Sequence, residues 1–347
     1  MLNKIFNKID DNKFISPKEV IYLLKTNKTE TNQLFLKADA VRKTYMGDEV
    51  YLRGIIEISN ICKRKCNYCG IRVGNNSVER YRMPADEILE TCKKLEKNHQ
   101  TTVVLQSGED TFYSKELFGE IIERIKKETN LAITVSIGKR NKKTYQYWHK
   151  KGMDRYLIRF ETSNEQLFKE AHPDDNLENR LNCIKNLQDI GVQTGSGFLI
   201  GLPKETYQQL ASDILFCTKL NLDMIGVGPF ISHRDTPFKK YKNSFSKDIF
   251  YKVISILRIL NKKSHIPSTT AFDAIDPNGR NLLLQRGANI FMPNSTPQKY
   301  RDKYQLYPGK PCVDESGEDC AKCTLDRITR LNRKIGTGFG HSIINSY

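Results

Sequence analysis

Three cysteines stand close together in the segment SNICKRKCNYC, at positions 62, 66 and 69. Three thiolates on one loop can hold three irons of a four-iron cubane and leave the fourth iron open to another molecule. Zinc sites usually take four ligands, and no further His or Cys close by completes such a set. The basic residues between the first two cysteines would also ease the negative charge of a thiolate-bound cluster. We therefore expect a [4Fe-4S] cluster on Cys62, Cys66 and Cys69, with structural zinc as the alternative.

A second cysteine group, Cys312, Cys320 and Cys323, follows much later in the chain. It could hold a [2Fe-2S] cluster with one outside ligand, a [4Fe-4S] cluster with an open iron, or zinc with a fourth ligand from elsewhere. The total of nine cysteines is odd, which argues against a disulfide framework. The remaining three lie in helical patterns, and we expect them to be small buried hydrophobes: Cys92, Cys183 and Cys217.

The elements that must position these residues alternate between strands and helices. Expected strands are 51–58, 102–106, 132–136, 156–160, 193–200, 224–227, 268–270 and 289–292. Amphipathic helical stretches lie between them, at 85–97, 115–129, 177–190, 207–220 and 248–261. Eight such repeats over roughly 250 residues match an α/β fold of the (βα)8 TIM-barrel type, with a doubly wound open sheet as the alternative.

The expected organisation has three parts. A helical extension occupies 1–48, where Ser16 and Pro17 read as an N-cap and first helical position for a helical pattern that runs to about Met46. The barrel occupies 49–298 and begins with the strand before the first cysteine group. A segment that caps the barrel and carries the second cysteine group occupies 299–347.

Polar residues gather where the expected strands end, and in a barrel the active site lies at those carboxyl ends. Arg159 and Glu161 close the fourth strand and should point to the same side by alternation. Gly195 and Gly197 lie within the fifth strand. Glycines inside a strand mark close approach of the backbone to another group, either a ligand or a neighbouring strand.

Composition limits the class of protein. Of 347 residues, 38% are hydrophobic and 28% are charged, which fits a globular protein. The chain shows neither an apolar run long enough for a membrane span nor a secretory signal, so we expect a cytoplasmic protein without a membrane partner. The formal net charge of +16 is spread along the chain rather than gathered in a basic arm, which argues against a nucleic-acid partner.

The first cysteine group, with an aromatic residue before its last cysteine, resembles the signature of radical S-adenosylmethionine (SAM) enzymes. The resemblance implies that the open iron binds the amino and carboxylate groups of SAM. The reduced cluster would then cleave SAM to a 5'-deoxyadenosyl radical. Tyr68 would lie near the adenine, and Gly108 matches the Gly-Glu segment that receives the SAM amino group.

Across about 48–323 the series of motifs resembles the HydE family, the radical SAM maturases of [FeFe]-hydrogenase. Shared stretches are 80–83, 105–110, 178–183, 225–230, 266–267, 269–271, 287–289 and 304–310. Residues that would bind SAM or its surroundings are Tyr68, Gln106, Gly108, Ser136, Glu161, Arg180 and Tyr304. A substrate cavity inside the barrel would be lined by Thr134, Ser136, Arg155, Arg159, Thr269, Thr270, Tyr304 and Tyr307. Two departures stand out: Phe160 where some relatives have His, and the stretch Ala171-His172-Pro173.

The resemblance also implies a substrate and partners. The substrate would be a small, anionic, sulfur-containing species, a cysteine-bound iron carbonyl cyanide, attacked at sulfur by the adenosyl radical on the way to the diiron centre. Partners would be a reducing electron donor and other hydrogenase maturases. Two alternatives stay open: an enzyme of the methylornithine synthase or biotin synthase type, and a non-catalytic, zinc-stapled RNA-binding protein. The sequence singles out no residue for acid–base or nucleophilic catalysis.

Overall fold

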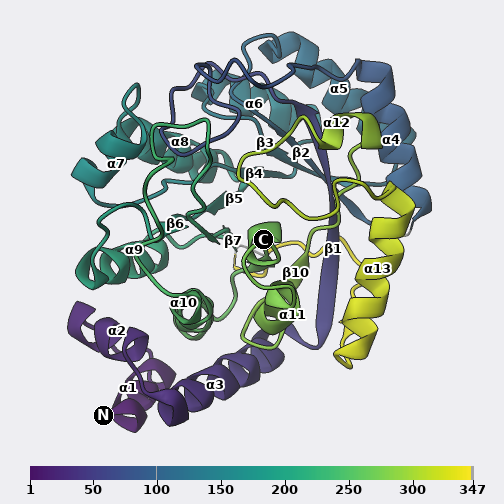
Figure 1. Cartoon of the computed structure of the whole chain (residues 1–347). Coiled ribbons are helices and arrows are strands. Elements are labelled where there is room, and N and C mark those ends of the chain that lie inside the picture. The colour runs from purple at the N-terminus through teal and green to yellow at the C-terminus, as the bar shows by residue number, and fades with distance from the viewer. Residues whose placement is uncertain (99, 345–347) are drawn as a thin grey trace.

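A computed structural model describes residues 1–98 and 100–344, and its centre is a barrel of parallel strands (Figure 1). Neighbouring strands follow the order β7-β5-β4-β3-β2-β1-β10-β9. A bridge between Met224 and His265 closes the ring between β7 and β9, where the N–H of Ile225 donates to the C=O of His265 at 2.8 Å. The strands are β1 (Glu49–Ser59), β2 (Thr102–Ser107), β3 (Ala132–Ser136), β4 (Arg155–Leu157), β5 (Gln193–Ser196), β7 (Met224–Ile225), β9 (Pro267–Ser268) and β10 (Ile290–Phe291). The expected (βα)8 barrel is confirmed, and the open sheet is not.

Helices follow the strands and form the outer layer. They are α4 (Ala85–Lys97), α5 (Lys115–Glu128), α6 (Lys142–Lys150), α7 (Glu165–Ala171), α8 (Leu177–Ile190), α9 (Tyr207–Lys219), α10 (Lys247–Leu260) and α11 (Gly279–Leu284). Their apolar stripes face the strands; α5, for example, buries Phe118, Ile121, Ile122 and Ile125. The lone cysteines Cys92, Cys183 and Cys217 are buried in this layer, as expected.

The later strands are shorter than expected. The expected strand 193–200 breaks into β5 and β6 (Leu199–Ile200), and the expected strand 224–227 ends at Ile225. A further short strand that was not expected, β8 (Gly228–Pro229), pairs with β6. Gly197 lies at the break between β5 and β6 with φ of +155°, and a Cβ there would come within 2.1 Å of the carbonyl oxygen of Gly226. This glycine therefore serves the close packing of neighbouring barrel segments. The expected strand 268–270 also ends early, because Thr270–Phe272 form the 3-10 helix η1.

The chain before β1 forms three helices: α1 (Leu2–Asp10), α2 (Pro17–Leu24) and α3 (Lys28–Met46). Ser16 caps α2 in a capping box with Glu19, which confirms the helix start read from the sequence. The helices α2 and α3 pack on α9 and α10 at the outside of the barrel (Figure 1). In the part of the chain that the structure describes, no helix is long and apolar enough to cross a membrane.

The chain after β10 crosses from one end of the barrel to the other. It forms α12 (Gln298–Arg301) and α13 (Gly317–Arg330), and then β11 (Lys334–Ile335) pairs with the start of β1. Beyond β11, residues 338–342 lie at the amino ends of the strands. This segment closes the end of the barrel opposite the cysteine loop.

Candidate active site at the carboxyl ends of the strands

The loop after β1 carries the first cysteine group and rests on the loop after β2. The backbone N–H groups of Arg64 and Glu109 donate to the Sγ of Cys62 at 3.4 and 3.3 Å. Gly108 makes this contact possible, because a Cβ there would lie 2.3 Å from the carbonyl oxygen of Ile61. The glycine of the predicted Gly-Glu segment is thus needed for the two loops to meet.

Ion pairs hold the two loops against each other. Arg64 donates to Glu109 at 2.6 Å, and Arg82 donates to both oxygens of Asp110 at 2.7 and 3.0 Å. Burial alone would raise the pKa of Glu109, but the hydrogen bond and charge of Arg64 lower it below its usual value. Asp110 behaves likewise, with Arg82 and the backbone N–H of Phe112 lowering its pKa. Both carboxylates are therefore charged at neutral pH and order the cysteine loop.

The three loop thiols suit a multi-iron cluster better than a single ion. Burial, followed by the charge of Cys62, raises the pKa of Cys69 to about 12. Burial and the charge of Cys69 raise the pKa of Cys66, so joint ionisation requires a compensating positive charge. Tetrahedral zinc would hold its sulfurs about 3.8 Å apart. Among the described residues, these thiols do not form a group whose ligand atoms all lie within 4.8 Å of one another.

A cavity of about 350 Å³ opens inside the barrel beside the cysteine loop. It is large enough for small molecules, not for a folded polymer. Nearly all of the residues expected to contact SAM or substrate line it. They are Tyr68, Gln106, Gly108, Thr134, Ser136, Arg159, Glu161, Arg180, Thr269, Thr270, Tyr304 and Tyr307, together with the three loop cysteines.

A charged group forms where β4 ends. Arg159 donates to Glu161 at 3.2 Å, although both residues lie beyond the end of β4. The Nη1 of Arg180 lies 4.0 Å from the same carboxylate and donates to the C=O of Arg159 at 2.9 Å. Glu161 has φ of +68°, a conformation that costs a non-glycine residue energy and is found where a site fixes a side chain. Its Oε2 is buried and makes no hydrogen bond to any described residue.

Hydroxyl and amide groups line the rest of the cavity. The side-chain amide of Gln106 donates to the OH of Tyr304 at 3.3 Å, and the OH of Tyr307 donates to Thr270 at 3.1 Å. Thr269 donates to the C=O of Val227 at 3.1 Å. The Oγ1 of Thr134 is buried and has no partner among the described residues. These groups offer hydrogen bonds to a small polar or anionic molecule.

Arg155 is the correction to the expected cavity lining. It stands at the start of β4 rather than at its end, and its side chain belongs to the opposite end of the barrel. Its guanidinium donates to the C=O of Phe339 at 2.7 Å and lies 2.9 Å from the Nδ1 of His341. The C-terminal segment thus occupies this cation, which is fully buried away from the substrate cavity.

Arg53 and His172 are among the cavity residues that the sequence did not predict. Arg53, on β1, reaches the cavity floor, where it donates to the sulfur of Met224 and to the C=O of Gly340. His172, which follows α7, lies between the cysteine loop and Arg180, and burial together with the charge of Arg180 holds its pKa well below the usual value. The unfamiliar stretch around His172 was the signal in the sequence; for Arg53 the sequence offered none.

The second cysteine group lies outside the barrel, at the start of α13. Among the described residues, Cys312, Glu315 and Cys320 form a group whose ligand atoms all lie within 4.8 Å of one another. Cys323 is one helical turn beyond Cys320 and exposed, so it does not belong to that compact group. The contact with Cys312 and the N–H of Asn294, 3.3 Å away, lower the pKa of Cys320. Two of the three expected ligands are therefore brought together, with a carboxylate beside them.

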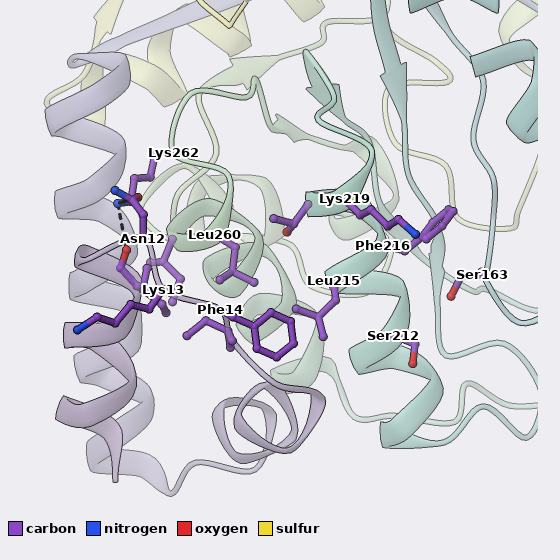
Figure 2. A pocket seen from close by; sticks show the side chains of 14 residues that line it. Asn12, Lys13, Phe14, Ser163, Ser212, Leu215, Phe216, Lys219, Leu260 and Lys262 are labelled. Atoms are coloured by element: carbon purple, nitrogen blue, oxygen red, sulfur yellow. Dashed lines mark hydrogen bonds between the residues drawn. The ribbon is translucent and has the colours of Figure 1, made fainter. Parts of the chain in front are cut away.

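A second hollow, of about 790 Å³, lies between the N-terminal helices and the helices α9 and α10 (Figure 2). Its walls include Phe14, Leu215 and Leu260, and Lys262 at its edge donates to Asn12 at 2.8 Å. Among the residues that the structure describes, none that lines this hollow is a cysteine, a histidine or a carboxylate. This hollow therefore lacks the groups for the expected chemistry, which belong to the barrel.

Comparison with known proteins agrees with this geometry. Residues 56–217 match the Radical SAM superfamily. The chain is 44% identical to the [FeFe] hydrogenase maturase subunit HydE of Thermotoga maritima, over 88% of each protein. It is 31% identical to 3-methylornithine synthase of Methanosarcina acetivorans, over 75% of this chain and 74% of that protein. The crystal structure of methylornithine synthase superposes with a TM-score of 0.83 at 25% identity, covering 95% of this chain and 97% of that chain.

The barrel, the cysteine loop after its first strand and the matched domain define a radical SAM enzyme. The extent and level of identity go further than this class. The chain belongs to the HydE family of [FeFe]-hydrogenase maturases. The family implies a [4Fe-4S] cluster and SAM as cofactors, which the three loop thiols and the adjoining cavity fit.

Proposed function

We propose that the enzyme acts on a small, anionic, sulfur-containing substrate, a cysteine-bound iron carbonyl cyanide, during assembly of the hydrogenase diiron centre. The observation that carries the proposal is the 44% identity to a HydE maturase over 88% of the chain. The cavity supports it, because Arg159, Thr134 and Thr269 offer a cation and hydroxyls to an anion inside a closed barrel. Such enclosure also keeps water from reactive species.

Cys62, Cys66 and Cys69 would hold the cluster, which would supply the electron for reductive cleavage of SAM. The chain's own residues bind and orient. Glu161 accepts hydrogen bonds from the ribose or amino group of SAM, and its buried Oε2 is the oxygen left for this role. Arg180 clamps the SAM carboxylate as a charge-assisted donor. Tyr68, Gln106, Gly108, Ser136 and Tyr304 complete the SAM surroundings.

The substrate lies deeper in the barrel, between the SAM region and the floor. Thr134, Ser136, Arg159, Thr269, Thr270, Tyr304 and Tyr307 bind it by hydrogen bonds and charge. The net charge of +16 raises the local concentration of an anionic molecule. A reducing electron donor and the other maturases supply electrons and exchange intermediates with this enzyme.

Reconstitution tests the maturase role. A cell-free maturation mixture with all other components should yield active hydrogenase only when this protein is added. Equal hydrogenase activity without it would refute the role while leaving radical SAM chemistry intact. Substrate choice is tested by anaerobic incubation of the reduced enzyme with SAM, with and without the iron complex. Formation of 5'-deoxyadenosine that does not depend on the iron complex would contradict the proposed substrate.

We also propose that Cys312, Cys320 and Cys323 hold an accessory metal centre, a [2Fe-2S] or [4Fe-4S] cluster. Two of the thiols already lie together, and a one-turn separation on α13 leaves Cys323 within reach after a change of rotamer. The neighbouring Glu315 carboxylate could complete the ligand set. Iron analysis with and without these cysteines tests the centre.

A further inference from the structure

His172 lies against one of the three cluster cysteines. Its Nδ1 is 3.2 Å from the Sγ of Cys66, and its Nε2 is 3.2 Å from the OH of Tyr68. The ring is 1% exposed and meets the Tyr68 ring edge-on, with the centroids 5.4 Å apart. One imidazole thus joins a cysteine of the loop to the aromatic residue before the last cysteine.

The backbone fixes His172 in this position. The N–H of His172 continues the hydrogen bonding of α7 to the C=O of Phe168 at 2.7 Å, and the two rings stack with centroids 4.8 Å apart. The cysteine loop binds the same helix end, because Asn67 donates through its backbone to Ala171 at 2.8 Å and through its side chain to Glu170 at 2.7 Å. The contact between imidazole and thiol is therefore part of how the loop is seated.

The direction of these hydrogen bonds follows from the donors available. A cysteine bound to iron carries no proton, so its sulfur can only accept, and Nδ1 must then be the donor. With the proton on Nδ1, the lone pair of Nε2 accepts from the OH of Tyr68. The Nη2 of Arg180 lies 3.3 Å from Nδ1 and can only donate. A protonated Nδ1 cannot accept that hydrogen bond, so with iron bound this nitrogen of Arg180 is free to bind SAM.

We propose that His172 is a positioning residue whose Nδ1–H donates to the sulfur of Cys66 and thereby raises the reduction potential of the cluster. A hydrogen bond to a ligand sulfur draws electron density from the cluster and favours its reduced state. Easier reduction matters here, because SAM cleavage begins with electron delivery to the cluster. The inference rests on the cluster assignment for the loop cysteines, and it does not depend on the proposed substrate.

Three substitutions separate the hydrogen bond from packing. His172→Asn keeps an amide donor close to the place of Nδ1 but loses the contact with Tyr68. His172→Gln places its amide near Nε2 and loses the donor to Cys66, and His172→Phe removes both while keeping a ring against Phe168. His149→Phe, at an exposed histidine of α6, is the matched control.

Each full-length protein is reconstituted anaerobically with iron and sulfide, and the midpoint potential of its cluster is measured by redox titration followed by electron paramagnetic resonance, without SAM or substrate. We expect more negative potentials for His172→Gln and His172→Phe, and potentials near the unaltered value for His172→Asn and His149→Phe. Equal potentials in all proteins would overturn the proposal. Equal shifts in the Asn and Phe variants would also overturn it, because they would assign the effect to packing.

A second measurement covers the case in which the variants lose iron. The unaltered protein, labelled with ¹⁵N-histidine, should show a weak nitrogen coupling to the reduced cluster, as a hydrogen-bonded nitrogen gives. No nitrogen coupling, or a strong coupling typical of a nitrogen bound to iron, would contradict the proposed hydrogen bond. Neither experiment uses substrate, so failure of the substrate assignment and failure of this inference are distinguishable.

Discussion

The Nζ of Lys310 lies 2.5 and 2.6 Å from the two carboxylate oxygens of Glu57, which is on β1 inside the barrel. The same ammonium donates to the C=O of Tyr304 at 3.0 Å. Both side chains of the pair are less than a tenth exposed. The pair thus fastens the segment 304–310 over the cavity and holds Tyr304 and Tyr307 in the cavity wall.

Removing the cation should be costly, because it leaves a buried carboxylate without its partner. Burial already raises the pKa of Glu57, even with Lys310 and Arg301 nearby. We expect Lys310→Met to lower the free energy of unfolding by about 3 kcal/mol, measured by chemical denaturation. The substitution should also weaken SAM binding, because Tyr304 loses the hydrogen bond from Lys310 that holds it in the cavity wall.

Two further variants show whether the buried charge is the cause. The double variant Glu57→Gln/Lys310→Met should recover much of the lost stability, since no unpaired charge stays buried. Lys303→Met removes an ion pair immediately before that segment, but its partner Glu79 is 72% exposed, so we expect a change below about 1 kcal/mol. Equal effects of the Lys310 and Lys303 substitutions would contradict the assigned role of the pair.

The loop cysteines are expected to be individually essential. Cys66→Ala removes one of three ligands from the cluster, and formation of 5'-deoxyadenosine, measured by chromatography after reduction with SAM present, should be abolished. Cys92→Ala is the control, because Cys92 is equally a buried thiol but lies within α4. Normal SAM cleavage by Cys66→Ala would sink the radical SAM assignment for this loop.

Glu161→Ala and Arg180→Ala should fold, keep iron and bind SAM more weakly. Loss of a charge-assisted hydrogen bond costs roughly 1.5–3 kcal/mol, so we expect about a ten- to a hundredfold loss of SAM affinity, measured by anaerobic calorimetry. Arg124→Ala breaks exposed ion pairs with Asp86 and Glu128 and should leave the affinity unchanged. If both site variants bind SAM as the unaltered protein does, the roles given to these residues are wrong.

The accessory centre should be dispensable for SAM cleavage. Replacing Cys312, Cys320 and Cys323 together by Ser should lower the iron content and leave 5'-deoxyadenosine formation intact, because α13 lies outside the barrel. The single variant Glu315→Gln tests whether the carboxylate takes part, since iron should then be retained less firmly. Complete loss of SAM cleavage in a folded triple variant would show that the second group serves the chemistry.

The sequence predicted the local features best. The cysteine spacing and the strands β1, β2 and β3 depend on residues that are consecutive in the sequence. The structure has these three strands within two residues of the expected bounds. The shorter strands were overextended, because the conformation of Glu161 and the contact of Gly197 with Gly226 depend on neighbouring strands. The ion pair of Glu57 with Lys310 joins residues 253 positions apart, and no local pattern marks it.

Arg155 is a second residue whose contacts could not be predicted from the local sequence. The family resemblance placed Arg155 in the cavity wall, but a strand has two ends, and Arg155 begins β4 while Arg159 follows it. Its acceptor, the C=O of Phe339, lies 184 positions later in the chain. Only the fold shows that this cation is satisfied by the C-terminal segment.

The C-terminal segment closes the amino end of the barrel. Arg53 and Arg155 both donate to its backbone carbonyls, at Gly340 and Phe339, with distances of 2.9 and 2.7 Å. Deleting residues 336–347 leaves both guanidinium groups without these acceptors and opens the cavity floor to water. We expect unfolding to become easier by roughly 1.5–3 kcal/mol for each lost charged hydrogen bond, reduced where water replaces the acceptor. The exposed cluster should also lose iron faster in air.

Phe339→Ser is the control: it changes the side chain and keeps the carbonyl, so stability and iron retention should stay near those of the unaltered protein. A deletion variant as stable and as slow to lose iron as Phe339→Ser would show that the segment does not seal the barrel.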